Sequence, residues 1–146
     1  MALIIRAVAA VLLGVLAVEP ASAESVDPRL AAIASEARGV IAVIDWFYVR
    51  HHTCPQPRRP TELAELQSEV GDGTSIELRG RFVAIRGIAM AAEWLYYTSP
   101  ERPDHCTLWR KLGWDPALIW RRRGGTASWS FDPGDGTPER PFRPTP

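Results

Sequence analysis

Residues 117–131 read ALIWRRRGGTASWSF, and this stretch indicates how the second half of the chain folds. Its first arm is apolar up to a run of three arginines, and its second arm, from Thr126 to Phe131, alternates small polar residues with apolar ones. An alternation of period two is typical of a strand with one dry face and one wet face. Gly124 and Gly125 stand between the arms, where a tight turn needs residues that tolerate positive φ angles. The stretch therefore predicts a β-hairpin.

Three segments before the hairpin also have the composition of strands. Aromatic and β-branched residues are frequent in TSIELRG at 74–80, RFVAIRGI at 81–88 and AAEWLYYT at 91–98, and glycines interrupt these segments. The segment TLWRKLGWDP at 107–116 fits a helical turn as well as a connecting loop, and we leave it unassigned. We therefore expect an antiparallel sheet of four or five strands.

One long helix is expected before these strands, from Pro28 to about His51. Asp27 can cap its N-terminus, and Pro28 suits the first helical position, where the missing N–H is no loss. Apolar residues then recur at spacings of three and four from Leu30 to Tyr48, as they do on the buried face of a helix. Prolines soon after His51 prevent the helix from continuing.

A second, short helix is predicted from Thr61 to Val70, with Gly71 as its C-terminal stop. Its glutamates recur at helical spacing and indicate a solvated face rather than a catalytic cluster. Together the elements predict an α+β fold. In this fold the long N-terminal helix packs on a four- or five-stranded antiparallel sheet, accompanied by the short second helix.

Residues 1–23 have the layout of an export signal. Arg6 supplies a positive charge, an apolar stretch follows up to Val18, and Ala-Ser-Ala at 21–23 matches the small-x-small cleavage pattern. The apolar stretch is shorter than the roughly 20 residues that a membrane-spanning helix needs. We therefore expect a periplasmic or secreted protein that is not stably inserted in a membrane after cleavage. An uncleaved N-terminal anchor is the alternative.

The rest of the chain fits one α+β domain from 24 to 131, followed by a flexible, proline-rich tail from 132 to 146.

Over the whole chain, seventeen basic residues balance seventeen acidic ones, so the formal net charge is zero. No nucleic-acid partner is expected, because binding through counterion release requires a basic surface.

The two cysteines and three histidines lie in two short stretches, HHTCPQ at 51–56 and PDHCT at 103–107. An oxidising compartment favours one disulfide between Cys54 and Cys106. The chain-entropy model predicts that this disulfide stabilises the folded state by about 4 kcal/mol.

The same disulfide would bring the three histidine side chains together, so a metal-binding protein or a metal-dependent hydrolase is the alternative function. Its centre would consist of His51, His52 and His105.

Recognisable catalytic motifs are absent from the sequence. It contains no Gly-x-Ser-x-Gly, no His-Glu-x-x-His, no phosphate-binding loop and no glycine-rich dinucleotide motif. We therefore expect no cofactor, and the sequence favours a function other than catalysis.

Six tryptophans in a chain of this size indicate either a contact surface or a core rich in aromatic rings. The run WRRR at 120–123 leads into the turn of the predicted hairpin, where exposed side chains are tolerated. Guanidinium groups bind carboxylates and stack on aromatic rings. We therefore predict a contact surface for an acidic partner, with a solubilising hairpin tip as the alternative. The candidate residues are Trp120, Arg121, Arg122 and Arg123.

The order of the elements between residues 28 and 97 carries a resemblance. A long helix ending in FYVRHHTCP at 47–55, then PTELAEL at 60–66 and then antiparallel strands resembles the layout of pilin-like periplasmic domains. This resemblance implies a helix lying across a sheet and a protein that acts through assembly rather than catalysis. The leader lacks the prepilin glycine–phenylalanine junction, so only the architecture carries over.

These observations predict an exported, non-enzymatic domain. It would bind a protein or an envelope polymer through a surface of aromatic residues and arginines. Neither the ligand nor the oligomeric state follows from the sequence.

Overall fold

The computed structural model describes residues 27–87 and 90–144 of the chain. Seven strands in this part of the chain form one antiparallel sheet, and each strand pairs with the next one in the sequence. The strands are β1 (Thr74–Arg79), β2 (Phe82–Gly87), β3 (Trp94–Ser99), β4 (Arg102–Lys111), β5 (Ala117–Arg123), β6 (Thr126–Asp132) and β7 (Arg140–Phe142). Antiparallel neighbours need no crossover connection, so short turns and loops suffice to join them.

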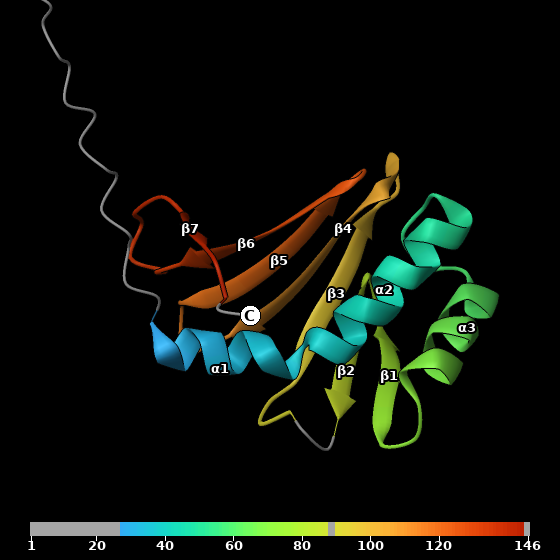
Figure 1. The fold of residues 1–146 in the computed structure, drawn as a ribbon, viewed down its shortest axis with the longest axis horizontal. Helices are drawn as coiled ribbons and strands as arrows, with labels where there is room; N and C mark the ends of the chain where they lie inside the picture. The colour runs from blue at the N-terminus through green and yellow to red at the C-terminus, as the bar shows by residue number, and fades with distance from the viewer. Residues whose placement is uncertain (1–26, 88–89, 145–146) are drawn as a thin grey trace, which may run out of the picture.

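Three helices precede the sheet in the sequence, and they are α1 (Pro28–Glu36), α2 (Arg38–His51) and α3 (Pro60–Val70). Figure 1 shows α1 and α2 following one another across one face of the sheet, while α3 lies beside β1. None of these helices lies on the opposite face, which we call the uncovered face.

The hydrophobic core lies between the helices and the covered face of the sheet. Val40 and Ile44 of α2 pack in one cluster with Trp94 and Tyr96 of β3 and with Leu108 of β4. All five side chains are almost completely buried. Burying a large apolar side chain stabilises a fold by about 1.5–3 kcal/mol. Apolar contact therefore fixes α2 on the central strands.

The predicted α+β fold class, with one long helix on a sheet of four or five strands, is wrong. The sheet has seven strands, and the expected helix from Pro28 to His51 is divided into the short helices α1 and α2. The division falls at Ala37, whose N–H donates to the carbonyl oxygen of Ala34, three residues back rather than four. Ala37 is fully buried, and the neighbouring Glu36 forms an ion pair with Arg110 of β4. Contacts with the sheet thus accompany the break, and the spacing of apolar residues along the helix does not reveal them.

The predicted hairpin is confirmed. β5 pairs with β6 from Ala117 opposite Asp132 to Arg123 opposite Thr126, and Gly124 in the turn has a φ of 57°. β1, β2 and β3 lie in the three segments predicted as strands, and α3 lies where the short helix was expected. The first half of the unassigned segment belongs to β4, which extends to Lys111.

β7 lies within the segment from 132 to 146 that we predicted as a flexible tail. It pairs with β6, and the ring of Phe142 meets the ring of Trp129 edge-on, with centroids 6.4 Å apart. Glu139, just before β7, accepts hydrogen bonds from Arg121 of β5. One aromatic contact and one ion pair thus hold this short segment on the sheet in spite of its proline content.

The free edge of β1 is closed at its start by α3. The side-chain amide of Gln67 donates a hydrogen bond to the carbonyl oxygen of Thr74 at 2.6 Å and accepts one from the N–H of Ile76 at 2.9 Å. β1 pairs with β2 alone, so these two backbone groups are on the side that has no neighbouring strand. Gln67 therefore supplies the two hydrogen bonds that a further strand would supply.

The export signal predicted for residues 1–23 lies outside the described residues. Among the helices within 27–87 and 90–144, none has the length and the apolar character needed to cross a membrane.

Candidate ligand-binding groove

The predicted disulfide between Cys54 and Cys106 is confirmed, and it joins the loop after α2 to strand β4. The two Cα atoms are 6.0 Å apart, which is a usual separation for bridged cysteines, and both residues are buried. Because both sulfurs are oxidised, neither cysteine offers a thiolate to a metal ion. The disulfide fixes the loop against the sheet.

Two hydrogen bonds strengthen this attachment. The N–H of Cys54 donates to the carbonyl oxygen of Pro103 at 2.7 Å, and the hydroxyl of Tyr96 donates to the carbonyl oxygen of Pro55 at 2.7 Å. Burial raises the pKa of the Tyr96 phenol well above its usual value. The hydroxyl therefore keeps its proton and remains a donor at neutral pH.

The loop then continues to the margin of the uncovered face. Gln56 accepts a hydrogen bond at 3.0 Å from the hydroxyl of Thr98 in β3, and its amide donates at 2.8 Å to the carbonyl oxygen of Cys54. Pro57, the next residue, is buried, whereas Arg58 is exposed. The disulfide and these hydrogen bonds thus place Pro57 and Arg58 at a fixed position beside β3.

The register of the strands arranges two rows of side chains on the uncovered face. Residues paired across antiparallel strands share a face, and so do residues two positions apart along one strand. Read from β3 through β4 to β5, the rows are Leu95, Trp109 and Ile119 in one and Tyr97, Thr107 and Arg121 in the other. Aromatic, apolar and cationic side chains are therefore gathered from three strands.

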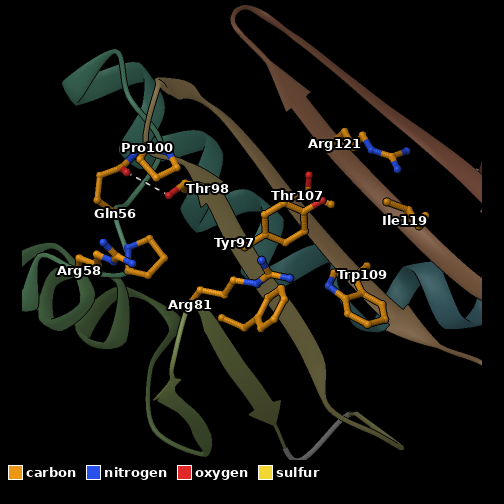
Figure 2. A pocket seen from close by; sticks show the side chains of 12 residues that line it. Gln56, Arg58, Arg81, Tyr97, Thr98, Pro100, Thr107, Trp109, Ile119 and Arg121 are labelled. Atoms are coloured by element: carbon orange, nitrogen blue, oxygen red, sulfur yellow. Dashed lines mark hydrogen bonds between the residues drawn. The ribbon is translucent and has the colours of Figure 1, made fainter.

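A groove of about 610 Å³ lies over these rows. Its lining residues are Gln56, Pro57, Arg58, Arg81, Phe82, Tyr97, Thr98, Pro100, Thr107, Trp109, Ile119 and Arg121. Figure 2 shows Tyr97 and Arg81 near the middle of the groove, with Trp109 and Arg121 to one side and Arg58 to the other. Aromatic rings thus line its middle and one side, and an arginine stands on each side.

The groove is lined by three arginines and by no acidic residue. The guanidinium group of Arg81 lies 4.9 Å from the ring centroid of Phe82, and that ring meets Tyr97 edge-on at 5.8 Å. Within the part of the chain that the structure describes, neither Arg58 nor Arg81 has a carboxylate at ion-pair distance. These two cations are available to a ligand.

Arg121, in contrast, is held by a carboxylate. Its Nη1 and Nη2 atoms donate to the two carboxylate oxygens of Glu139 at 2.6 and 2.7 Å, and Nη1 also donates to the hydroxyl of Ser130 at 2.8 Å. The hydrogen bonds from Arg121 hold the pKa of Glu139 below its usual value. Arg121 therefore shapes the groove while Glu139 offsets its charge.

A smaller hollow of about 180 Å³ continues from the groove toward the tip of the β5–β6 hairpin. The two share Tyr97, Thr107 and Arg121 as lining residues. His105 of β4 and Arg123 of β5 are opposite one another in the register and line the far part of this hollow. Basic side chains are therefore found at both ends of one continuous depression.

The contact surface predicted at 120–123 is divided between the two faces of the sheet. Trp120 is only 2 % exposed and belongs to the core, so it cannot supply the exposed ring that we expected. Arg122 points to the helices, where it forms an ion pair with Asp45 of α2. Only the other two arginines lie on the uncovered face. The reason is the alternation of a strand, which sends consecutive side chains to opposite sides.

The three histidines are not gathered as metal ligands. His51 lies 3.2 Å from Glu65, and His105 lies 3.9 Å from Asp104. His52 follows the end of α2 and has a left-handed backbone conformation with a φ of 57°. Across residues 27–87 and 90–144, no group of three or more histidine, cysteine or acidic side chains is placed to hold a metal ion. The geometry therefore gives no support to the alternative of a three-histidine centre.

The sequence did not single out the groove residues Arg58, Arg81, Phe82 and Trp109 as a site. A signal for Trp109 exists in the pairing of strands, because aligning β4 with β5 puts Trp109 opposite Ile119. Arg58 could not be placed in this way, since a loop and a disulfide bring it to the groove.

Comparisons with protein-family models, with characterised proteins and with solved structures find no match to this chain. The resemblance to pilin-like domains therefore stays a prediction, and the functional argument rests on the groove itself.

Proposed function

We propose that this chain is an exported, non-enzymatic domain that binds an acidic protein or envelope polymer in the groove on the uncovered face of its sheet. The observation that carries the proposal is the position of Arg58 and Arg81. Arg81 lies over the ring of Phe82, Arg58 lines the same groove, and neither has a carboxylate partner among the described residues. The two cations can therefore pair with a ligand without first breaking an internal ion pair.

The combination of arginines and aromatic rings suits an anionic ligand. A guanidinium group binds a carboxylate through two parallel hydrogen bonds, and a ring beside it offers apolar contact area at a small loss of side-chain entropy. The partial burial of Tyr97 and Trp109 holds these rings in place before a ligand arrives. A ligand therefore loses little affinity to the ordering of these two side chains.

The chemistry of the lining residues favours binding over catalysis. No histidine, cysteine or carboxylate is among the groove residues, so this set offers no side chain that accepts a proton or attacks as a thiolate near neutral pH. The hydroxyls of Thr98 and Thr107 have no such base beside them in this set.

Export is supported by two features of different kinds. The sequence of residues 1–23 has the layout of a signal peptide, and the disulfide between Cys54 and Cys106 is of a kind that persists in oxidising compartments. A periplasmic or secreted location is therefore part of the proposal.

The test uses two acidic polymers, polyglutamate and polygalacturonate, with neutral dextran as the blank. Isothermal titration at low salt should detect binding of at least one acidic polymer to the purified exported chain. An exposed ion pair contributes about 0.2–1 kcal/mol, so Arg58→Ser combined with Arg81→Ser should weaken binding by about 2- to 30-fold. Raising the salt concentration should weaken it as well.

The matched control is Arg29→Ser combined with Arg38→Ser. These arginines are exposed on α1 and α2, and their removal changes the net charge by the same amount. The control variant should bind like the wild type. If neither acidic polymer binds, or if both double variants lose affinity equally, the groove is not the binding site.

A further inference from the structure

We infer that the occupant of the groove is an acidic polysaccharide, a polymer of uronic acid units, and not an acidic peptide. This inference rests on the proposed function and narrows it to one class of ligand. Three observations carry it, namely the location of the groove on the face of the sheet, the arrangement of its rings and the distribution of its charges.

Much of the groove lies on the face of the sheet, where a peptide finds few backbone partners. Along the groove β4 pairs with both β3 and β5, and β5 pairs with both β4 and β6, so the backbone N–H and C=O groups of these two strands are engaged in the sheet. β2 pairs only with residues 94–96 of β3, so only the short stretch 97–99 of β3 has an outer side without a neighbouring strand. Extended peptides gain affinity from main-chain hydrogen bonds at a free sheet edge. A peptide lying across the groove would gain few from these strands, whereas a sugar polymer has no backbone amides that need such partners.

Two rings in the groove offer contact area to a polymer of sugar units. Tyr97 is opposite Thr107, and Trp109 is two residues further along β4, so the two rings are diagonal neighbours on one face. Such neighbours are about 7–8 Å apart. The π face of an aromatic ring carries negative partial charge and attracts the weakly positive C–H groups of a sugar. Tyr97 and Trp109 can therefore contact two sugar units of one chain.

The charges in the depression are separated in a way that matches a chain with repeated carboxylates. Arg58 and Arg81 belong to the groove, while Arg123 and His105 line the hollow at the other end. Thr107 and Tyr97 line the part that the groove and the hollow share. A polymer with one carboxylate on each unit can meet basic groups at both ends at once, which a ligand with a single anionic group cannot.

The experiment compares three soluble probes of similar length by isothermal titration. These are oligomers of galacturonic acid, the same oligomers with their carboxylates methyl-esterified, and oligomers of glutamate. The galacturonic acid oligomers should bind most tightly, and esterification should weaken their binding by about tenfold. Trp109→Ala should weaken it by about fivefold, because the stacking surface is lost. Trp109→Phe keeps a ring and should retain most of the affinity.

Trp46→Ala is the control, because this exposed tryptophan is on α2, away from the uncovered face. It should bind galacturonic acid oligomers as the wild type does. If the glutamate oligomers bind as tightly as the galacturonic acid oligomers or more tightly, and the binding depends on Arg58 and Arg81, the polysaccharide inference is overturned and the proposed function stands. Equal binding of the esterified oligomers also overturns it. Absence of binding by all three probes overturns both.

Discussion

The hydroxyl of Tyr96 and the carbonyl oxygen of Pro55 form a hydrogen bond inside the core, out of contact with water. Tyr96→Phe removes the donor and leaves a buried carbonyl group without a partner, which costs about 1–3 kcal/mol. We expect Tm to fall by several degrees in a thermal melt followed by circular dichroism. Tyr97→Phe is the matched control, because the described residues give the Tyr97 hydroxyl no hydrogen-bond partner. If Tyr96→Phe has the same Tm as the wild type, the hydrogen bond between Tyr96 and Pro55 does not stabilise the fold.

Glu139 should titrate at an unusually low pH. Hydrogen bonds from Arg121 lower its pKa in the folded protein. The ionised carboxylate therefore stabilises the fold above the ordinary glutamate pKa of about 4.3, and this contribution is lost as the pH falls through the lower folded value. An NMR titration of the Glu139 carboxyl carbon should give a midpoint below about 4.3. Arg121→Gln should raise that midpoint, and Arg123→Gln should raise it much less. Equal midpoints in the wild type and in Arg121→Gln would contradict the ion pair.

Among the elements, the loop between α2 and α3 depends most directly on the disulfide. Replacing Cys54 or Cys106 with serine should destabilise the protein by about 4 kcal/mol and lower Tm by about 10 °C or more. Reductant should do the same to the wild type. Because this loop carries Arg58, binding of acidic polymers should weaken even at temperatures where the variant is folded. Thermal melts and titrations with and without reductant test both effects, and unchanged values in both would show that the link is dispensable.

Elements whose signal is local were predicted from the sequence, and elements whose limits depend on tertiary contacts were not. The β5–β6 hairpin follows from alternation and from two glycines in its turn. The break at Ala37 lies beside the ion pair between Glu36 and Arg110, which are far apart in the sequence. The half of β4 from Thr107 to Lys111 cannot be assigned from the sequence, because its pattern of polar and apolar residues is inverted. Arg110 faces the helices through that ion pair, while Trp109 faces the groove, so polar and apolar residues do not mark the two sides.

At the scale of the whole molecule, the kinds of residue in the candidate site were predictable and their identities were not. Composition and the run at 120–123 pointed to arginines with aromatic rings. The groove takes one arginine of that run, Arg121, and combines it with Trp109 from β4 and Arg58 from a loop. This combination depends on strand register and on a disulfide. Both bring together residues that are distant in the sequence, and no local pattern encodes them.

The side-chain amide of Gln67 also bears on how the molecule behaves at high concentration. An open sheet has two outer strands, and bare outer strands recruit strands from other copies and so start fibrous aggregation. At one margin the amide of Gln67 already occupies two backbone groups of β1. At the other margin β7 is three residues long and contains Pro141, which has no N–H to offer an incoming strand. At both margins an incoming strand would therefore find fewer free backbone partners than a bare outer strand offers, and this lowers the tendency of the sheet to grow strand by strand.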